Sequence, residues 1–152
     1  MAAGRTKTTY TLHPYEADGA SDGHSYGTVA ADALGVPREH VFKTLIAEVD
    51  GRLIVGVVPV STTLDLKALA AAVGGKRAAM ADPALAEKAT GYVRGGISPL
   101  GQRKRLRTVI DASVTALPTV YVSAGRRGLQ MELKPQDLIK LTEAVTAPIG
   151  SP

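Results

Sequence analysis

The stretch Val41-Phe-Lys-Thr-Leu-Ile-Ala-Glu-Val-Asp-Gly-Arg-Leu-Ile-Val-Gly-Val-Val-Pro-Val60 decides the fold. It contains two runs, 41–49 and 52–60, that are rich in β-branched and other apolar residues and are typical of strands. The dipeptide Asp50-Gly51 between them is favoured in a type I′ turn, because both central residues of that turn need a positive φ. We therefore predict an antiparallel hairpin at the centre of a sheet.

The residues on either side of this hairpin predict further strands and short helices. Extended segments are expected at 8–13, 108–111, 119–123 and 129–133, and helices at 26–34, 66–73 and 84–89 and from 135 to about 145. Strands and helices do not alternate regularly, so a doubly wound parallel sheet is not favoured. The pattern predicts an α+β fold with a mixed, largely antiparallel sheet flanked by short helices. The tail, 148–152, is expected to fray.

Length and composition favour one globular unit. With 152 residues the chain corresponds to one domain, spanning 1–152 with a core at about 9–145 and frayed termini. Its 45% hydrophobic and 21% charged residues exclude intrinsic disorder. No apolar run approaches the roughly 20 residues of a membrane span, and the first residues lack the apolar centre of a secretory signal. We therefore expect a cytoplasmic protein with no membrane partner.

The absence of cysteine excludes several kinds of chemistry. Without cysteine the chain has no disulfides, thiolate metal ligands or thiol nucleophiles. His13, His24 and His40 lack the spacing of a metal-binding pair on a helix, so we expect neither a metal nor a cofactor. Aromatic residues make up only 4%, too few for a platform that stacks bases. The net charge of +4 makes a polyanionic partner plausible, with phosphate contacts dominating.

Lys43 interrupts an apolar row in the first strand of the hairpin. Strand alternation places it on one face with Val41, Leu45, Ala47 and Val49. A lysine at such a position can extend its amine to solvent along the apolar surface. It can also bind an anion or a carbonyl oxygen in a cleft. The residues alone leave both interpretations open.

A second unusual segment is Gly95-Gly-Ile-Ser-Pro-Leu-Gly101. Adjacent glycines let backbone N–H groups approach a ligand closely, although a tight turn is an equally common use of them. Gln102-Arg103 follow where a P-loop needs Lys-Ser/Thr, so the segment is not a P-loop. Leu100 stands where a nucleophile elbow needs glycine, so Ser98 is not predicted to be a hydrolase nucleophile.

Cations and a tyrosine complete the candidate residues. Arg103-Lys-Arg-Leu-Arg107 places four cations directly after the glycine segment, and Lys76-Arg77 and Arg126-Arg127 are further pairs. Such clusters can hold phosphates, but they also occur as solvated faces. Tyr15 follows His13-Pro14, where its phenol could donate a hydrogen bond into a cleft or pack at the edge of a core.

Several motifs together resemble the YbaK/EbsC family. They occur in the family's order over about 9–145, and they are Val41-Phe-Lys-Thr-Leu45, Leu64-Asp-Leu-Lys67, Met80-Ala-Asp-Pro83, Thr90-Gly-Tyr-Val-Arg-Gly-Gly-Ile-Ser-Pro-Leu-Gly-Gln-Arg-Lys-Arg105, Tyr121-Val-Ser-Ala-Gly-Arg-Arg-Gly-Leu129 and Glu132-Leu133. The glycine segment separates the YbaK branch from relatives that edit Ala-tRNA(Pro). The resemblance implies a trans-editing deacylase that releases cysteine from Cys-tRNA(Pro), and in this branch also from Cys-tRNA(Cys). The implied fold is a mixed sheet flanked by helices, like the editing insertion of bacterial prolyl-tRNA synthetases.

The resemblance also implies site residues. The family's functional lysine, tyrosine and glycine correspond to Lys43, Tyr15 and Gly95, and the substrate's own thiol is expected to attack the ester carbonyl. Backbone N–H groups at Gly95 and Gly96 would polarise that carbonyl, Lys43 would hold the terminal adenosine or a developing negative charge, and Tyr15 would orient the substrate. Substrate binding is expected at Gly96, Ile97 and Ser98, and contact with the tRNA backbone at Arg103, Lys104 and Arg105.

Alternatives remain at the level of substrate and activity. The chain departs from the family at Val58-Pro59, where relatives often carry Thr-Pro, and in the loop 19–24. A deacylase for another small aminoacyl-tRNA such as Ala-tRNA(Pro), and a non-catalytic module that binds aminoacyl-tRNA or nucleotides, are the alternatives. Prolyl-tRNA synthetase is the expected partner in a ternary complex.

Overall fold

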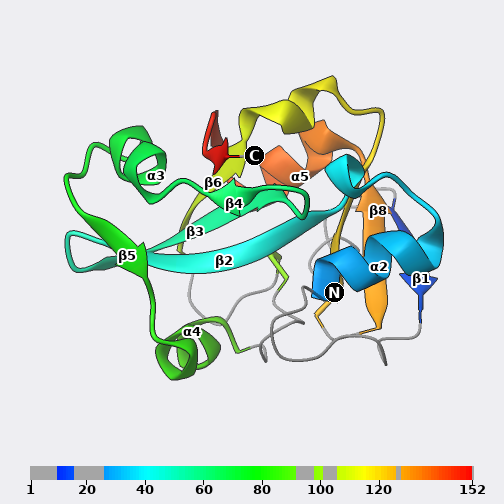
Figure 1. The fold of residues 1–152 in the computed structure, drawn as a ribbon, viewed down its shortest axis with the longest axis horizontal. Helices are drawn as coiled ribbons and strands as arrows, with labels where there is room; N and C mark the ends of the chain where they lie inside the picture. The colour runs from blue at the N-terminus through cyan, green and yellow to red at the C-terminus, as the bar shows by residue number, and fades with distance from the viewer. Residues whose placement is uncertain (1–9, 16–25, 92–97, 101–105, 126–127, 152) are drawn as a thin grey trace.

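The central hairpin of the fold has the register that its turn sequence predicts. A computed structural model describes residues 10–15, 26–91, 98–100, 106–125 and 128–151 (Figure 1). Strand β2 (Phe42–Val49) pairs antiparallel with β3 (Arg52–Pro59), and Val49 lies opposite Arg52 beside the turn. Asp50 has φ 49° and Gly51 φ 84°, the positive values of a type I′ turn. The predicted hairpin is therefore confirmed.

Three further strands extend this hairpin into a mixed sheet. The strand order is β5-β2-β3-β6-β9, with β5 at Ala78–Met80, β6 at Arg107–Asp111 and β9 at Val145–Ala147. β5 pairs antiparallel with β2, whereas β6 runs parallel to both β3 and β9. The hairpin strands thus lie inside the sheet, which explains their nearly continuous apolar sequence.

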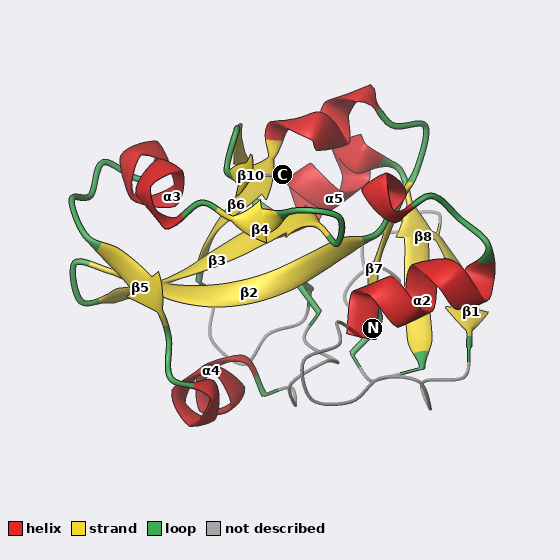
Figure 2. Ribbon diagram, viewed as in Figure 1, coloured by secondary structure: helices red, strands yellow, loops and turns green. Residues whose placement is uncertain are grey.

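A second sheet adjoins the beginning of β2 (Figure 2). It is antiparallel with the order β1-β8-β7, formed by β1 (Tyr10–Pro14), β8 (Leu129–Leu133) and β7 (Val120–Ser123). A parallel bridge between Val41 and Tyr121 joins β7 to the chain just before β2. This bridge places the start of the hairpin against strands from the other half of the sequence.

Four α-helices flank the sheets in the described part of the chain, as the α+β fold class predicts. They are α2 (Tyr26–Leu34), α3 (Leu66–Ala72), α4 (Pro83–Thr90) and α5 (Pro135–Thr142), and two 3₁₀ segments occur at η1 (Arg38–His40) and η2 (Ala112–Ala116). The Asp65 carboxylate accepts a hydrogen bond from the Ala68 N–H at 3.0 Å, and that of Asp82 accepts from Ala84 at 2.8 Å. Aspartate is among the residues preferred at this N-cap position, because its carboxylate accepts from a free N–H of the first turn. Among the described residues no helix is long and apolar enough to cross a bilayer.

The two faces of the central sheet bury different groups of side chains. One face packs Phe42 and Ile46 against the second sheet, α4 and α5, whereas the other packs Ala47 and Val49 against α3. Val41 packs separately with Tyr121 and with Ala31 of α2. The alternation predicted along β2 is therefore confirmed. Lys43 lies on the same face as Val41 and Ala47, between the cluster that contains Val41 and the cluster that packs against α3.

The C-terminal segment differs from expectation in two places. α5 ends at Thr142 with Glu143 at φ 53°, and Val145 begins β9 instead of continuing the helix. The tail does not fray through 151, because β10 (Gly150–Ser151) pairs with β4 (Thr63–Leu64) and Ile149 is fully buried. In both places backbone groups pair with strands distant in the sequence, so local periodicity gives no sign of them.

Candidate functional site

Lys43 is the first element of the candidate site. It is the second residue of β2, lies opposite Val58 of β3 and is half-buried. Burial lowers the pKa of its ammonium group, because removal from water disfavours the charged form. No carboxylate in the described part of the chain forms an ion pair with it. A half-buried amine without an anionic partner can receive an anion or a polar oxygen from a ligand.

A row of polar residues extends from Lys43 across the second sheet. Since Val41 and Tyr121 are bridged in parallel, Lys43 and Ser123, each two residues further on, leave their strands on the same face. Ser123 lies opposite Gln130 in β8, and Gln130 lies opposite His13 in β1. No sequence motif marks this row. Its only signal was the alternation of polar with apolar residues along 119–123 and 129–133.

Two members of the row are buried polar side chains. Ser123 is 8% exposed and Gln130 is 4% exposed. The Ser123 hydroxyl accepts a hydrogen bond from the Gly125 N–H at 3.3 Å. The Gln130 side-chain oxygen has no hydrogen-bond partner within the described residues. An unsatisfied buried acceptor costs about 1–3 kcal/mol, so a ligand that donates a hydrogen bond there would recover that free energy.

Glu132 lies on the same face of the second sheet, two residues from Gln130 along β8, and forms hydrogen bonds to its neighbours. Its carboxylate lies 2.9 Å from His13 Nε2 and accepts a hydrogen bond from the Thr119 hydroxyl at 2.7 Å. The Thr119 hydrogen bond is the main cause of a lowered pKa at Glu132. Burial and the nearby Glu132 charge raise the pKa of Tyr121, whose ring lies 5.3 Å from that of His13. This network holds the imidazole and the phenol in place beside the polar row.

Tyr15 lies at the opposite side of the polar row from Lys43. Its backbone N–H donates to the Gly128 carbonyl at 2.9 Å, which continues the pairing of β1 with β8 past Pro14. Gly128 has φ 87°, and a Cβ there would lie 3.1 Å from the Tyr15 carbonyl oxygen, so glycine suits this position. From Val41, just before β2, to β1 there are three strand spacings of about 4.8 Å, roughly 14 Å. A ligand touching both long side chains would lie across Ser123 and Gln130.

The described part of the glycine segment, 98–100, is anchored in the core. Ser98 is 2% exposed, and its hydroxyl accepts a hydrogen bond from the Leu100 N–H at 3.1 Å, which shapes the turn. Leu100 belongs to the apolar cluster that contains Phe42, the neighbour of Lys43. Six other predicted site residues lie outside the described residues, namely Gly95, Gly96, Ile97, Arg103, Lys104 and Arg105. Across the described ranges, no cluster of three or more acidic or histidine side chains could hold a metal ion.

Comparisons with known proteins identify the family of this chain. Residues 21–141 match the family described as the aminoacyl-tRNA editing domain. A protein of Enterococcus faecalis, named as a candidate Cys-tRNA(Pro)/Cys-tRNA(Cys) deacylase, EbsC, is 37% identical over 131 residues, which are 85% of this chain and 79% of that protein.

Solved structures share the same fold at lower identity. The crystal structure of a hypothetical protein, APE2540, has a TM-score of 0.85 at 24% identity and covers 98% of this chain and 96% of its own. The crystal structure of a candidate trans-editing enzyme for prolyl-tRNA synthetase has a TM-score of 0.82 at 23% identity. That match covers 94% of this chain and 87% of the other chain. These structures support the fold class expected from the sequence. With most of its length matched, this chain belongs to the aminoacyl-tRNA editing domain family.

Proposed function

We propose that this protein is an aminoacyl-tRNA deacylase that releases cysteine from Cys-tRNA(Pro), with Cys-tRNA(Cys) as a second substrate. The observation that carries the proposal is the half-buried Lys43 amine, without an ion-pair partner in the described residues, on a polar face in a member of the editing family. The 37% identical relative, whose name specifies the same two substrates, supports the choice of aminoacyl group.

The chemistry requires little from the protein beyond position and charge. An aminoacyl ester is already activated, and its carbonyl oxygen becomes negative as a nucleophile attacks. We assign the nucleophile to the substrate thiol. Its sulfur bonds to the carbonyl carbon, the bond to the ribose oxygen breaks, and the proton lost by the thiol ends on the ribose hydroxyl. The products are cysteine thiolactone and free tRNA, and no protein cysteine is needed.

The proposed roles rest on the positions of Lys43, Tyr15 and Ser98 and, for the other residues, on the family motifs. Lys43 binds the terminal adenosine or the developing oxyanion, and Tyr15 orients the aminoacyl end from across the polar row. The backbone N–H groups of Gly95 and Gly96 polarise the carbonyl. Gly96, Ile97 and Ser98 are assigned to substrate binding, and Ser98 also shapes its turn. Phosphate contacts are assigned to Arg103, Lys104 and Arg105, and prolyl-tRNA synthetase is proposed to deliver the substrate in a ternary complex.

Lys43→Met tests the central assignment, because methionine keeps an unbranched side chain of similar length and removes the charge. We expect kcat/KM for Cys-tRNA(Pro) to fall by about 100-fold or more, the usual effect of removing a group that stabilises charge in the transition state. The matched control is Lys134→Met, at an exposed lysine before α5, which should retain activity. Turnover that survives Lys43→Met in a folded protein would contradict the role of Lys43.

The substrate series distinguishes the mechanisms. Deacylation is measured on Cys-tRNA(Pro), Ser-tRNA(Pro) and Ala-tRNA(Pro) side by side, since serine keeps the shape of cysteine with a poorer nucleophile. Selective loss of cysteine, with thiolactone detected before its hydrolysis, supports attack by the substrate thiol. Equal loss of serine or alanine would instead indicate attack by water. Binding without any deacylation, with prolyl-tRNA synthetase present, would contradict the enzymatic proposal.

A further inference from the structure

The turn of the central hairpin lies in a surface hollow rich in cations. This hollow, of about 790 Å³, lies between the turn, α3 and β5, and it is lined by three cations, Lys67, Lys76 and Arg77, and by Glu48 and Asp50. All five of these side chains are exposed. A second hollow shares Asp50 with the first and adds Arg52 and Arg107. We call the five cations, Lys67, Lys76, Arg77, Arg52 and Arg107, the hairpin-end surface.

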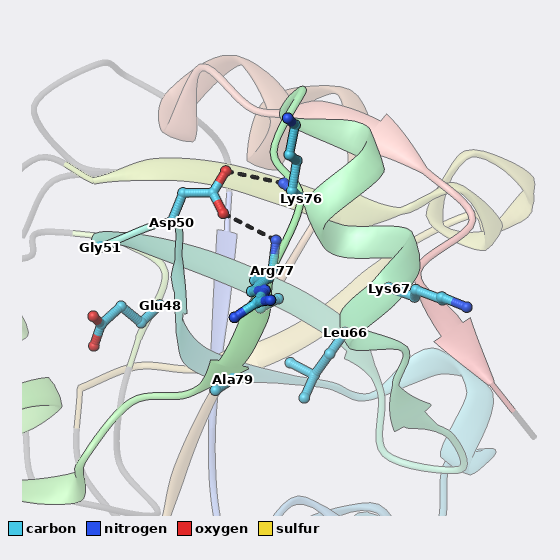
Figure 3. Close-up of a pocket in the computed structure, with 9 residues that line it drawn as sticks. Glu48, Asp50, Gly51, Leu66, Lys67, Lys76, Arg77 and Ala79 are labelled. Carbon is cyan, nitrogen blue, oxygen red and sulfur yellow. Dashed lines mark hydrogen bonds between the residues drawn. The ribbon is translucent and has the colours of Figure 1, made fainter.

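Asp50, the carboxylate shared by the two hollows, is hydrogen-bonded to backbone N–H groups. The Asp50 carboxylate accepts hydrogen bonds from the N–H groups of Lys76 and Arg77, each at 2.9 Å (Figure 3). These two bonds are the main cause of a lowered pKa at Asp50. Among the described residues, none of the five cations forms an ion pair. Asp50 therefore shapes the turn, while the cations remain available to an external anion.

The cations do not converge on one point. Figure 3 shows the side chains of Lys67, Lys76 and Arg77 extending in different directions from the hollow. A single small anion would need several donors aimed at the same place. Cations that spread over a surface instead match a polymer with regularly spaced charges, such as a nucleic-acid backbone.

The hairpin-end surface is also well separated from the candidate site. Lys43 lies near the start of β2 and Asp50 directly follows its end, seven residues on, which corresponds to about 23 Å of extended chain. An RNA whose 3′ end lies at Lys43 and whose backbone follows β2 would bring phosphates of its base-paired stem to the hairpin end. A fragment containing only the last nucleotides would not reach it.

We propose that the hairpin-end surface binds the phosphate backbone of the tRNA stem, while the aminoacyl end occupies the site at Lys43. This inference rests on the proposed function, because the substrate is taken to be an aminoacyl-tRNA. It adds a second, distant binding surface that discriminates whole tRNA from short aminoacyl esters. Binding there is independent of sequence, since phosphates carry no base information.

The test compares two triple variants that lose the same charge. Lys67→Ala/Lys76→Ala/Arg77→Ala removes three cations of the hairpin-end surface. Lys88→Ala/Lys134→Ala/Lys140→Ala removes three exposed lysines from α4 and from the start and last turn of α5. KM and kcat are measured for full-length Cys-tRNA(Pro) and for the cysteinyl ester of a short 3′-terminal oligonucleotide. Binding of uncharged tRNA is measured over a series of salt concentrations.

For the hairpin-end variant we expect KM for full-length tRNA to rise about tenfold or more with little change in kcat. The slope of log Kd against log salt should fall by roughly 2 to 3, about one for each phosphate that the variant no longer neutralises. KM for the short ester should be unchanged, and the control should resemble the parent protein. Arg52→Ala/Arg107→Ala, in the second hollow, should give a smaller change of the same kind.

Three outcomes would overturn the inference. These are a hairpin-end variant that binds tRNA with the parent salt slope, an equal effect on the short ester, and an equal loss in the control. Binding of an acidic protein that depends on the hairpin-end surface, with tRNA binding unchanged, would assign the surface to a protein partner instead. If the parent protein deacylates no Cys-tRNA, the proposed function fails, whereas the salt slope for uncharged tRNA still decides the surface.

Discussion

At the scale of the residue, Lys43 illustrates how a functional group can oppose stability. Burial lowers the pKa of its ammonium group, and no described carboxylate within ion-pair distance offsets the desolvation. At neutral pH the folded state therefore carries a penalty that the unfolded state does not. A bound oxyanion would remove the penalty and raise that pKa again.

Lys43→Met should consequently increase the free energy of unfolding near neutral pH, even as it lowers kcat/KM. The unfolded state binds more protons between the lowered pKa and the ordinary value of Lys43, so the parent protein should gain stability as pH rises through that interval. The advantage of the methionine variant should shrink over the same range. Urea unfolding at several alkaline pH values measures this, and a variant less stable than the parent at every pH would contradict it.

Glu132 has the opposite effect from Lys43 and stabilises the folded state at neutral pH. Its folded-state pKa is lowered, chiefly by the Thr119 hydroxyl, so its contribution is present above the ordinary carboxyl pKa and is lost as pH falls through the lowered value. Glu132→Gln should cost about 1 kcal/mol at neutral pH and make the acid loss of stability less steep. Glu48→Gln, at an exposed carboxylate of β2, is the control and should change neither. An acid transition of unchanged slope in Glu132→Gln would refute the assignment.

At the scale of the element, Asp111 joins the end of one strand to the C-terminal segment. One carboxylate oxygen accepts from the N–H groups of Ile149 at 3.0 Å and Gly150 at 2.8 Å, and the other accepts from Ser113 at the start of η2. The side chain is 8% exposed. These bonds hold Ile149 in the core and align β10 with β4.

Asp111→Ala should therefore destabilise the protein by about 2–4 kcal/mol, because it leaves several partly or fully buried N–H groups without acceptors. Asp82→Ala provides the comparison, since Asp82 caps α4 through its hydrogen bond from the exposed Ala84 N–H and its loss should cost only about 1 kcal/mol. Urea denaturation of the two variants gives the difference. Equal destabilisation would show that the C-terminal segment does not depend on Asp111.

Element boundaries were predictable where local chemistry sets them. The β2–β3 turn, the caps at Asp65 and Asp82 and the stop at Gly91, which has φ 81°, all depend on residues within one turn of chain. The end of α5 was not predictable in this way. Leu138, Leu141 and Val145 continue a helical spacing, but Val145 forms a parallel pair with Val109. The hydrogen bonds available at the edge of β6 outweigh a weak periodic signal.

At the scale of the whole molecule, the candidate site and the hairpin-end surface lie at opposite ends of one strand, β2. β2 begins beside the polar row of the second sheet and ends in the cations of the hairpin-end surface, so a single rigid element fixes the distance between them. A substrate that is itself long and charged can use both ends. Discrimination between whole tRNA and a free aminoacyl ester would then follow from the length of a strand.

The sequence by itself determined the hairpin, the capped helices, the fold class and the candidacy of Lys43 and Tyr15, because these depend on local backbone preferences, alternation and motif. Only the tertiary structure decided that Lys43 shares a face with Ser123 and Gln130, that His13 pairs with Glu132, and that the tail is buried. His13 and Glu132 are separated by 119 positions in the chain. Contacts at that separation depend on strand register and on which backbone groups remain unpaired, and neither quantity is encoded in a local pattern.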